Sequence, residues 1–421
     1  MNKLFTTSLL LCGAIMAQAQ EQVRVWKDGE SKRFTTSEMT FSNGGANILV
    51  NDSTYDVMTL DSITVVHTVT VTFAGDTAYV DYGHAANVTD TIKGAHVKLV
   101  STNTKSELEF VLQGTSTHGS LTYDGPLKCR FYLNGLNLKS DQGAALDIKC
   151  GKRIDLILMD GTENKLEDAA GGEQKAALHC KGHLEVSGKG NLTITGNAKH
   201  GISTKEYMEI KKSTGKIIIK KAMSDAMHIG QYFLMSGGQL SISGQQPGDG
   251  IQVELMTTIT ENNDTIPNPD KEHNGEVMIR GGVISVNTLG DLVKGIKCPG
   301  DMTVSGGTIT VNAQGEGNKG ISVSGNMLIN EDDVNETYPK TNIIIKANGG
   351  DFEYEDDDED LEHSRPLSVK GDLTIMAGYV QLDNQGSDPS QYGGTYYGPK
   401  YTANYTGTAT LKGTIVKKQP K

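Results

Sequence analysis

The sequence predicts an all-β fold: a right-handed parallel β-helix with three short strands per coil and about 24 residues per coil. Three observations predict this fold. An apolar motif recurs at intervals of 24 or 25 residues, glycines separate short segments of alternating apolar and polar residues, and helical periodicity is lacking. A single coil cannot bury its inward side chains, but stacked coils bury them against the coils on either side.

The recurring motif is centred on a column of apolar residues that we expect to point into the stack. The intervals along this column are 32, 24, 25, 24, 45, 25 and 46 residues. Each of the two longest intervals is interpreted as one period plus a polar insertion, at residues 257–275 and 330–340. The column consists of Leu146, Leu178, Ile202, Met227, Ile251, Ile296, Ile321 and Leu367.

Cysteines follow the same repeat. Cys180 and Cys298 each lie two residues after a central apolar residue, so both are predicted to point inward, four coils apart. At a stacking distance of about 4.8 Å they would be roughly 19 Å apart, far beyond disulfide reach. We therefore expect buried thiols there, while a bond between Cys129 and Cys150 stays open.

The two ends of the chain differ from the repeat. Residues 1–19 have the pattern of a secretory signal, with Lys3, an apolar stretch and the cleavage motif Ala17-Gln18-Ala19, which predicts export to the periplasm, cell surface or medium. Leu11 is a poor fit to the residue that precedes a lipidated cysteine, so an anchor at Cys12 is not favoured. Residues 20–90 are expected to form a small β module, residues 91–385 the β-helix, and residues 386–421 a segment rich in Tyr and Gly.

The charge balance excludes some partners. The chain has 39 basic and 51 acidic residues, a formal net charge of −12, and loses one more positive charge if Lys3 is cleaved away. Such a protein repels nucleic acids and anionic lipids at long range. No apolar run after the signal is long enough to span a membrane, and the sequence does not determine an oligomeric state.

Common catalytic motifs are not found. The segment Gly320-Ile321-Ser322-Val323-Ser324 misses the nucleophile pattern at its fifth position. A G-x-G-x-x-G match at 315–320 lies between two short strands rather than before a helix, so its glycines are interpreted as bends.

Charged residues recur two positions before the central apolar residues. Asp225 and Asp249 would lie on adjacent coils, where two carboxylates repel unless a cation or basic neighbours intervene. Two interpretations stay open: a charge ladder neutralised by His200 and Lys294, and a calcium site built from oxygen ligands of neighbouring turns. The column is His200, Asp225, Asp249, Lys294, Lys319 and Arg365.

A second polar column follows the central apolar residues by one position and is predicted to point outward. Its members are His179, Ser203, His228, Gln252, Lys297, Ser322 and Ser368.

Two further segments carry a family resemblance. Leu133-Asn134-Gly135-Leu136-Asn137, the segment 160–166 (DGTENKL) and the repeated Gly-Ile units resemble the bacterial secreted "carbohydrate-binding domain-containing" β-helix proteins, over roughly residues 95–385. That family is similar in shape to the family 9 pectate lyases. The resemblance implies binding of polysaccharides such as cellulose and polygalacturonate, in association with calcium. Its Asp-Gly-Ile motif is complete only at Asp249-Gly250-Ile251.

The resemblance and the polar columns together predict an exported, non-catalytic polysaccharide-binding protein with calcium as its expected cofactor. Asp225 and Asp249 are the candidate metal ligands. The candidate carbohydrate-binding residues are His228, Gln252, Lys294, Lys297 and Lys319, and no catalytic residue is assigned. One alternative is a calcium-dependent polysaccharide lyase that acts on pectate, with Lys294 as the base. The other is a surface adhesin or structural rod.

Overall fold

The computed structural model describes residues 22–28, 30–35, 39–50, 53–83, 85–171, 176–244, 246–331, 340–354, 361–385, 396–397, 403–405, 409–411 and 414–418. The predicted signal, including Cys12, lies outside these residues, as does most of the segment 386–421. The structure divides into two units. The described residues up to Thr68, with Gly83 and Ala85, form the first, and Val69–Tyr82 with the described residues from Ala86 onward form the second.

The first unit is made of antiparallel strands. β1 (Gln22–Lys27) pairs with β2 (Glu30–Thr35) and with the first residues of β6 (Ser62–Ala74). β3 (Met39–Ser42), β4 (Asn47–Val50) and β5 (Ser53–Asp56) form a separate three-stranded sheet. Two short 3-10 helices, η2 (Asn43–Gly45) and η3 (Val57–Thr59), flank β4 and β5. Among the described residues, no helix has the length and apolar character needed to cross a membrane.

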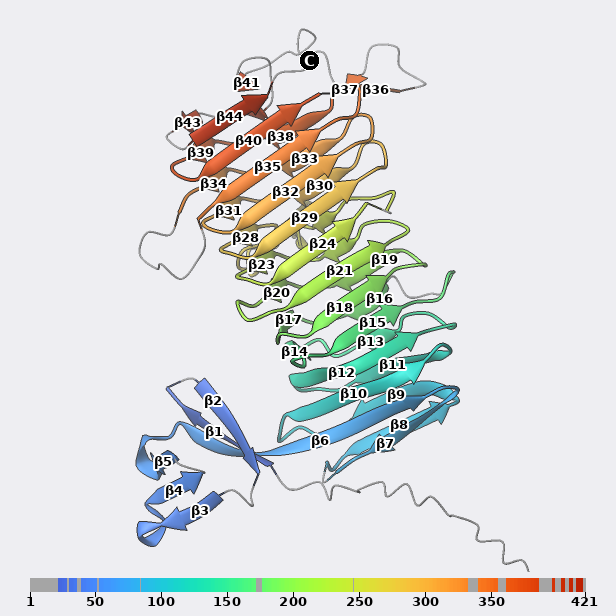
Figure 1. The fold of residues 1–421 in the computed structure, drawn as a ribbon, viewed down its shortest axis with the longest axis vertical. Coiled ribbons are helices and arrows are strands. Elements are labelled where there is room, and N and C mark those ends of the chain that lie inside the picture. Colours follow the sequence, from blue (N-terminus) through green and yellow to red (C-terminus); the bar gives the residue numbers. More distant parts are fainter. Residues whose placement is uncertain are drawn as a thin grey trace, which may run out of the picture. The chain divides into compact units, whose positions relative to one another are not determined.

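The second unit contains a thirteen-stranded sheet, here called sheet one, to which successive coils contribute one strand each (Figure 1). Neighbouring strands are parallel except at the two ends, where β8 pairs antiparallel with β9 and β41 with β42. The strands are β8 (Val88–Lys93), β9 (Ala95–Ser101), β11 (Gly119–Asp124), β13 (Leu146–Ile148), β16 (Ala176–Cys180), β19 (His200–Thr204), β22 (Met227–Ile229), β25 (Ile251–Val253), β30 (Lys294–Cys298), β33 (Lys319–Val323), β38 (Arg365–Val369), β42 (Ala403–Tyr405) and β41 (Tyr396–Tyr397).

Two further parallel ladders complete each coil. The first runs through β10 (Leu108–Ser116), β12 (Cys129–Lys139), β14 (Ile154–Leu158), β17 (Leu184–Ser187), β20 (Met208–Ile210), β23 (Phe233–Met235), β28 (Val277–Ile279), β31 (Met302–Val304), β34 (Met327–Ile329), β39 (Leu373–Ile375) and β43 (Ala409–Leu411). The second starts from the end of β12 and runs through β15 (Glu163–Glu167), β18 (Asn191–Thr195), β21 (Lys216–Lys221), β24 (Gln239–Ser243), β29 (Val283–Thr288), β32 (Thr308–Ala313), β35 (Asn342–Ala347), β40 (Tyr379–Asn384) and β44 (Thr414–Lys418). β6 continues into this unit, where its last residues pair antiparallel with β7 (Thr77–Asp81).

These long parallel sheets confirm the predicted all-β architecture and are those of a β-helix. The handedness of the coil stays a prediction. The central apolar column is confirmed, because its eight members pair in register from Leu146 to Leu367 and are all fully buried. Cys129, Cys150, Cys180 and Cys298 are all buried free thiols, so the alternative of a Cys129–Cys150 bond is not realised.

The interval between Ile251 and Ile296 contains the predicted insertion. These two residues pair directly, and the extra chain between them forms a hairpin of β26 (Thr257–Ile259) and β27 (Thr265–Pro267). The next long interval contains a second hairpin, β36 (Phe352–Glu353) and β37 (Leu361–Glu362), while residues 332–339 lie outside the described residues.

Glycine occupies the second position of several strands of sheet one, and we call this position the glycine corner. A Cβ atom on Gly295 would lie 2.3 Å from Val311 Cγ1 and 2.5 Å from the carbonyl oxygen of Gly320. Gly320 is equally confined, because its Cβ would lie 2.1 Å from Ile345 Cγ2. The backbone therefore enters sheet one so close to the core and to the next coil that a side chain does not fit.

Candidate functional site

Two columns of polar side chains run along sheet one, with exposed members such as Lys297 and buried ones such as Asp147 and His200. We call the first the strand column, because each member follows a central apolar residue within a strand and pairs in register with the next. Its members are Asp147, His179, Ser203, His228, Gln252, Lys297, Ser322 and Ser368. We call the second the corner column, and its members are His200, Asp225, Asp249, Lys294, Lys319 and Arg365. The two columns together form what we call the polar face.

Members of the two columns contact each other. His228 Nδ1 lies 3.1 Å from Asp225 Oδ2, and Lys297 Nζ lies 4.0 Å from Asp249 Oδ2. The rings of His200 and His228 stack, with centroids 4.5 Å apart and an angle of 22° between the planes. The corner residues therefore belong to the same surface as the strand column.

Each corner aspartate also holds the next coil in place. Asp225 Oδ1 accepts a hydrogen bond from the Asp249 N–H at 2.9 Å, and Asp249 Oδ1 accepts one from the Lys294 N–H at 2.6 Å. One oxygen of each carboxylate is thus committed to the backbone, and the other is left for the polar face. Charge-assisted bonds of this kind are stronger than neutral ones.

His200, Asp225 and His228 form a compact group that we call the His–Asp cluster. His200 is only 1% exposed, and its Nδ1 lies 3.3 Å from Asp225 Oδ2 without making a well-formed hydrogen bond. Burial, with the nearby His228, lowers the pKa of His200 to about 4, so this imidazole is neutral at pH 7. Burial alone would raise the pKa of Asp225, but the contacts with the two histidines lower it instead.

Lys294, Lys297 and Lys319 form a second group, the lysine cluster, a few coils further along. Burial lowers the pKa of Lys294, and the positive charges of Lys319 and Lys297 lower it further, although Asp249 acts in the opposite direction. Lys319 forms an ion pair with Glu362. Like charges gathered on adjacent coils create a positive potential that favours an anionic ligand.

The calcium site at Asp225 and Asp249 stays a prediction, and the donors fit calcium poorly. Calcium takes six to eight oxygen ligands. The free oxygen of Asp225 faces two imidazoles, and that of Asp249 faces the Lys297 ammonium. The surroundings of these two aspartates thus provide nitrogen donors and a positive charge rather than a cage of oxygens.

The structure places every residue predicted for carbohydrate binding on the polar face. His228, Gln252 and Lys297 occupy consecutive positions of the strand column, and Lys294 and Lys319 are neighbours in the corner column. Gln252 donates a hydrogen bond to the Glu254 carboxylate.

Sequence reasoning missed a further pair on this face. His179 Nδ1 lies 2.8 Å from Asp147 Oδ1, in register on adjacent strands. The pair was missed because the interval of 32 residues between Leu146 and Leu178 is longer than one period, and Asp147 had not been assigned to the strand column.

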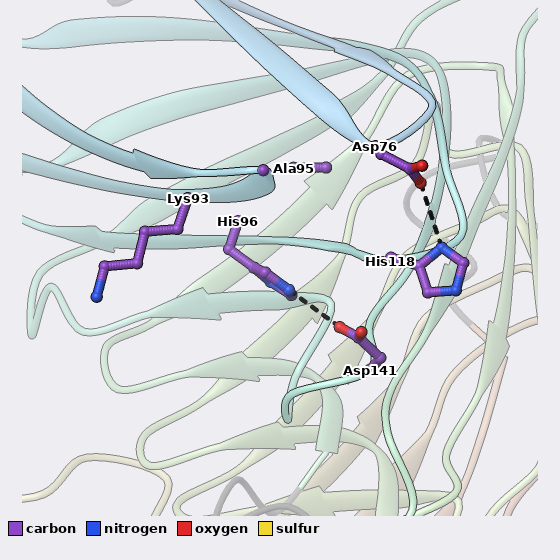
Figure 2. Close-up of a pocket in the computed structure, with 7 residues that line it drawn as sticks. Asp76, Lys93, Ala95, His96, His118 and Asp141 are labelled. Atoms are coloured by element: carbon purple, nitrogen blue, oxygen red, sulfur yellow. Dashed lines mark ion pairs between the residues drawn. The ribbon is translucent and has the colours of Figure 1, made fainter.

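A separate open pocket of about 350 Å³ lies among the first strands of the second unit (Figure 2). His96 Nε2 lies 3.0 Å from Asp141 Oδ1, and His118 Nδ1 lies 3.5 Å from Asp76 Oδ1. Nδ1 of His96 also contacts Ser120 Oγ at 2.9 Å, so both of its ring nitrogens are engaged. The repeat continues further towards the N-terminus than the sequence had indicated, because Val97 and Leu121 pair in register with Leu146. The sequence pattern had been traced only from Leu146, so the pocket was missed. Its lining residues are Asp76, Lys93, Gly94, Ala95, His96, His118 and Asp141.

Half-buried aromatic rings line a corner after sheet one. Tyr207 and Tyr232 stack at 4.6 Å with an angle of 12°, and His183 stacks on Tyr207 at 4.3 Å. Sugars bind to the faces of aromatic rings, and here the faces are covered by the rings of neighbouring coils. This stack therefore contributes to coil packing rather than to a sugar platform.

The fold and the polar face define the class of this protein: a repeat protein of parallel β coils with one extended polar surface. The family described as "Carbohydrate-binding domain-containing protein" matches residues 93–388, and the chain belongs to that family.

Two known proteins are similar to this chain, one in sequence and one in structure. A "Carbohydrate-binding domain-containing protein" of Acetivibrio thermocellus is 26% identical over 121 residues, which span 26% of this chain and 42% of that relative. A solved structure described as a polysaccharide lyase-like protein from C. thermocellum, a gadolinium derivative, is 23% identical with a TM-score of 0.50. It covers 63% of this chain and 98% of its own, and the likeness shows the fold.

Proposed function

We propose that this protein is an exported, non-catalytic binder of polysaccharides, and that the glycan lies along the polar face between Asp147 and Arg365. The observation that carries the proposal is the unbroken register of the strand column over eight coils. Coils follow each other at about 4.8 Å, which is close to the advance of one sugar per link in an extended chain. Family membership supports the carbohydrate as the ligand.

The charges on the face favour acidic glycans over neutral ones. Lys297 is 41% exposed, so its ammonium group can reach a uronate carboxylate. Lys319 lies on the next coil but is 18% exposed and forms an ion pair with Glu362, so it contributes mainly to the local potential. An anionic ligand would also relieve the repulsion within the lysine cluster. Contacts of exposed charges are individually weak, so binding would depend on several coils acting together.

Affinity electrophoresis on a panel of soluble neutral and acidic polysaccharides tests the proposal, with and without calcium. We expect retardation by at least one glycan, and weaker retardation for Lys297→Ala. Lys165→Ala, at an exposed position in β15 of another ladder, is the matched control and should behave as wild type. Unchanged mobility across the whole panel would refute polysaccharide binding.

A second function, polysaccharide lyase, is favoured by one observation. The lowered pKa of Lys294 is the property of a lysine that can act as a base, taking the proton beside a uronate carboxylate while the bond to the leaving sugar breaks. Its ammonium instead donates to the Leu292 carbonyl at 2.5 Å, as a structural lysine would. Growth of unsaturated-product absorbance with pectate, abolished by Lys294→Ala, would establish the lyase and exclude the binder.

A further inference from the structure

The His–Asp cluster has the composition of a transition-metal site. Its three donor atoms lie within 4.8 Å of one another and come from two imidazoles and one carboxylate. Imidazole nitrogen suits zinc and its neighbours in the first transition series, whereas calcium takes oxygen ligands. Sequence reasoning had placed a cation between two aspartates, and the structure instead surrounds Asp225 with histidines.

The two distances from the carboxylate to the imidazoles are close to those between the ligands of a tetrahedral ion. Asp225 Oδ2 lies 3.1 Å from His228 Nδ1 and 3.3 Å from His200 Nδ1. Zinc binds imidazole nitrogen and carboxylate oxygen at about 2.0–2.2 Å, so two ligands of a tetrahedron lie roughly 3.3–3.5 Å apart. The two imidazole donor atoms lie within 4.8 Å of each other, so the side chains can reach one ion by adjusting around the fixed carboxylate.

Two features show that the His–Asp cluster is preorganised for metal binding. His200 is 1% exposed, and its Nδ1 points at the carboxylate without a well-formed hydrogen bond, a cost that a bound ion would remove. The other oxygen of Asp225 accepts the Asp249 N–H, which fixes the carboxylate in the way that outer hydrogen bonds orient metal ligands.

We propose that His200, Asp225 and His228 bind one divalent transition-metal ion, with zinc as the representative, and leave a fourth position open. The opening lies on the side of His228, whose side chain is 29% exposed while that of His200 is 1% exposed. Sites with three protein ligands keep a position for water or another ligand. The ion would thus lie on the polar face, but its binding rests on the cluster alone and does not depend on the proposed function.

Equilibrium dialysis of the chelator-treated protein against zinc chloride, without polysaccharide, tests the site. We expect one zinc ion per chain, and at least about tenfold weaker binding in His228→Gln and Asp225→Asn. Cobalt chloride gives a second readout, because cobalt(II) absorbs more strongly in the visible range when it is four-coordinate. Far-UV circular dichroism establishes that each variant is folded.

His179→Gln is the matched control, because His179 contacts Asp147 on the same face as His228 contacts Asp225. It should bind zinc like wild type. The proposal is overturned if wild type binds no zinc, if folded His228→Gln keeps wild-type affinity, or if His179→Gln weakens binding equally. Calcium binding with the same variant pattern and no zinc binding would also overturn it. Since no glycan is present, each of these results is separate from the fate of the proposed function.

Discussion

The His–Asp cluster and the lysine cluster occupy the same two columns of one repeating backbone, yet they differ in chemistry. His200 and Lys294 hold equivalent corner positions, and His228 and Lys297 hold equivalent strand positions. In the first region the free oxygen of Asp225 faces the imidazoles of His200 and His228. In the second, that of Asp249 faces an ammonium group.

This difference shows that the two oxygens of each corner aspartate have separate roles: one stabilises the fold, and the other takes part in the chemistry of the polar face. Oδ1 of both aspartates performs the same task, accepting an N–H from the next coil. The environment of Oδ2 is set by the neighbouring columns and can change from coil to coil. A repeat can therefore carry different sites on the same backbone.

The largest expected effect comes from removing the hydrogen bond between a corner aspartate and the backbone of the next coil. Asp249→Ala leaves the buried Lys294 N–H without its acceptor, and we expect the free energy of unfolding to fall by about 1.5–3 kcal/mol. Asp249→Asn keeps an acceptor oxygen and should lose less. Urea denaturation measures both, and equal losses would show that the charge, rather than the backbone bond, stabilises this corner.

The glycine corner allows a comparison of the same substitution in the two regions. In Gly295→Ala the new Cβ meets Val311 Cγ1 at 2.3 Å, and we expect a loss of about 1–3 kcal/mol. In Gly201→Ala the nearest atoms are 2.8 Å away, so the loss should be smaller. Gly151→Ala, with no atom within 4 Å, is the control for urea denaturation. A loss at Gly201 that equals the loss at Gly295 would contradict the idea that the corner is tighter in the lysine region.

Salt dependence separates the two clusters functionally. Lys297→Ala should weaken binding of an acidic polysaccharide about two- to fivefold at low salt, as expected for an exposed charge, and Lys319→Ala should weaken it less because Lys319 is paired with Glu362. His228→Gln should leave the salt dependence unchanged, because the His228 ring contacts Asp225 and lies outside the lysine cluster. Titration calorimetry at two salt concentrations measures this, and a reduced salt dependence in His228→Gln would remove the distinction.

The buried cysteines of the two regions are expected to react alike. Burial raises the pKa of both Cys180 and Cys298 to about 12, so both thiols stay protonated near pH 8. A thiol reagent should therefore label neither residue in the folded protein and both after denaturation. Labelling of only one in the native state would show that the two regions differ in stability of packing.

The sequence predicted the parts of this structure that repeat. Ile251 and Ile296 were assigned to one column across an insertion, and the two residues pair directly. Burial of alternate residues made this possible, since period and polarity are visible along the chain.

Contacts between columns could not be predicted in the same way. The stacking of His200 on His228 joins the corner column of one coil to the strand column of the next, and such a contact leaves no periodic signal in the sequence. The pocket combines His96, on the first strands of the repeat, with Asp76 and Asp141 from connecting segments, whose positions follow no period. The predicted Tyr-rich segment after residue 385 lies mostly outside the described residues.

The hydrogen bond from each corner aspartate to the next coil has a consequence for assembly of the chain. Since the acceptor on Asp225 is in place only when its own coil has formed, it offers a docking point for the incoming Asp249 N–H, and Asp249 then does the same for Lys294. Growth by nearest-neighbour addition is the expected behaviour of such arrays. Docking of one coil would then assist docking of the next, and a substitution at Asp225 or Asp249 would weaken the junction between the two coils that it joins.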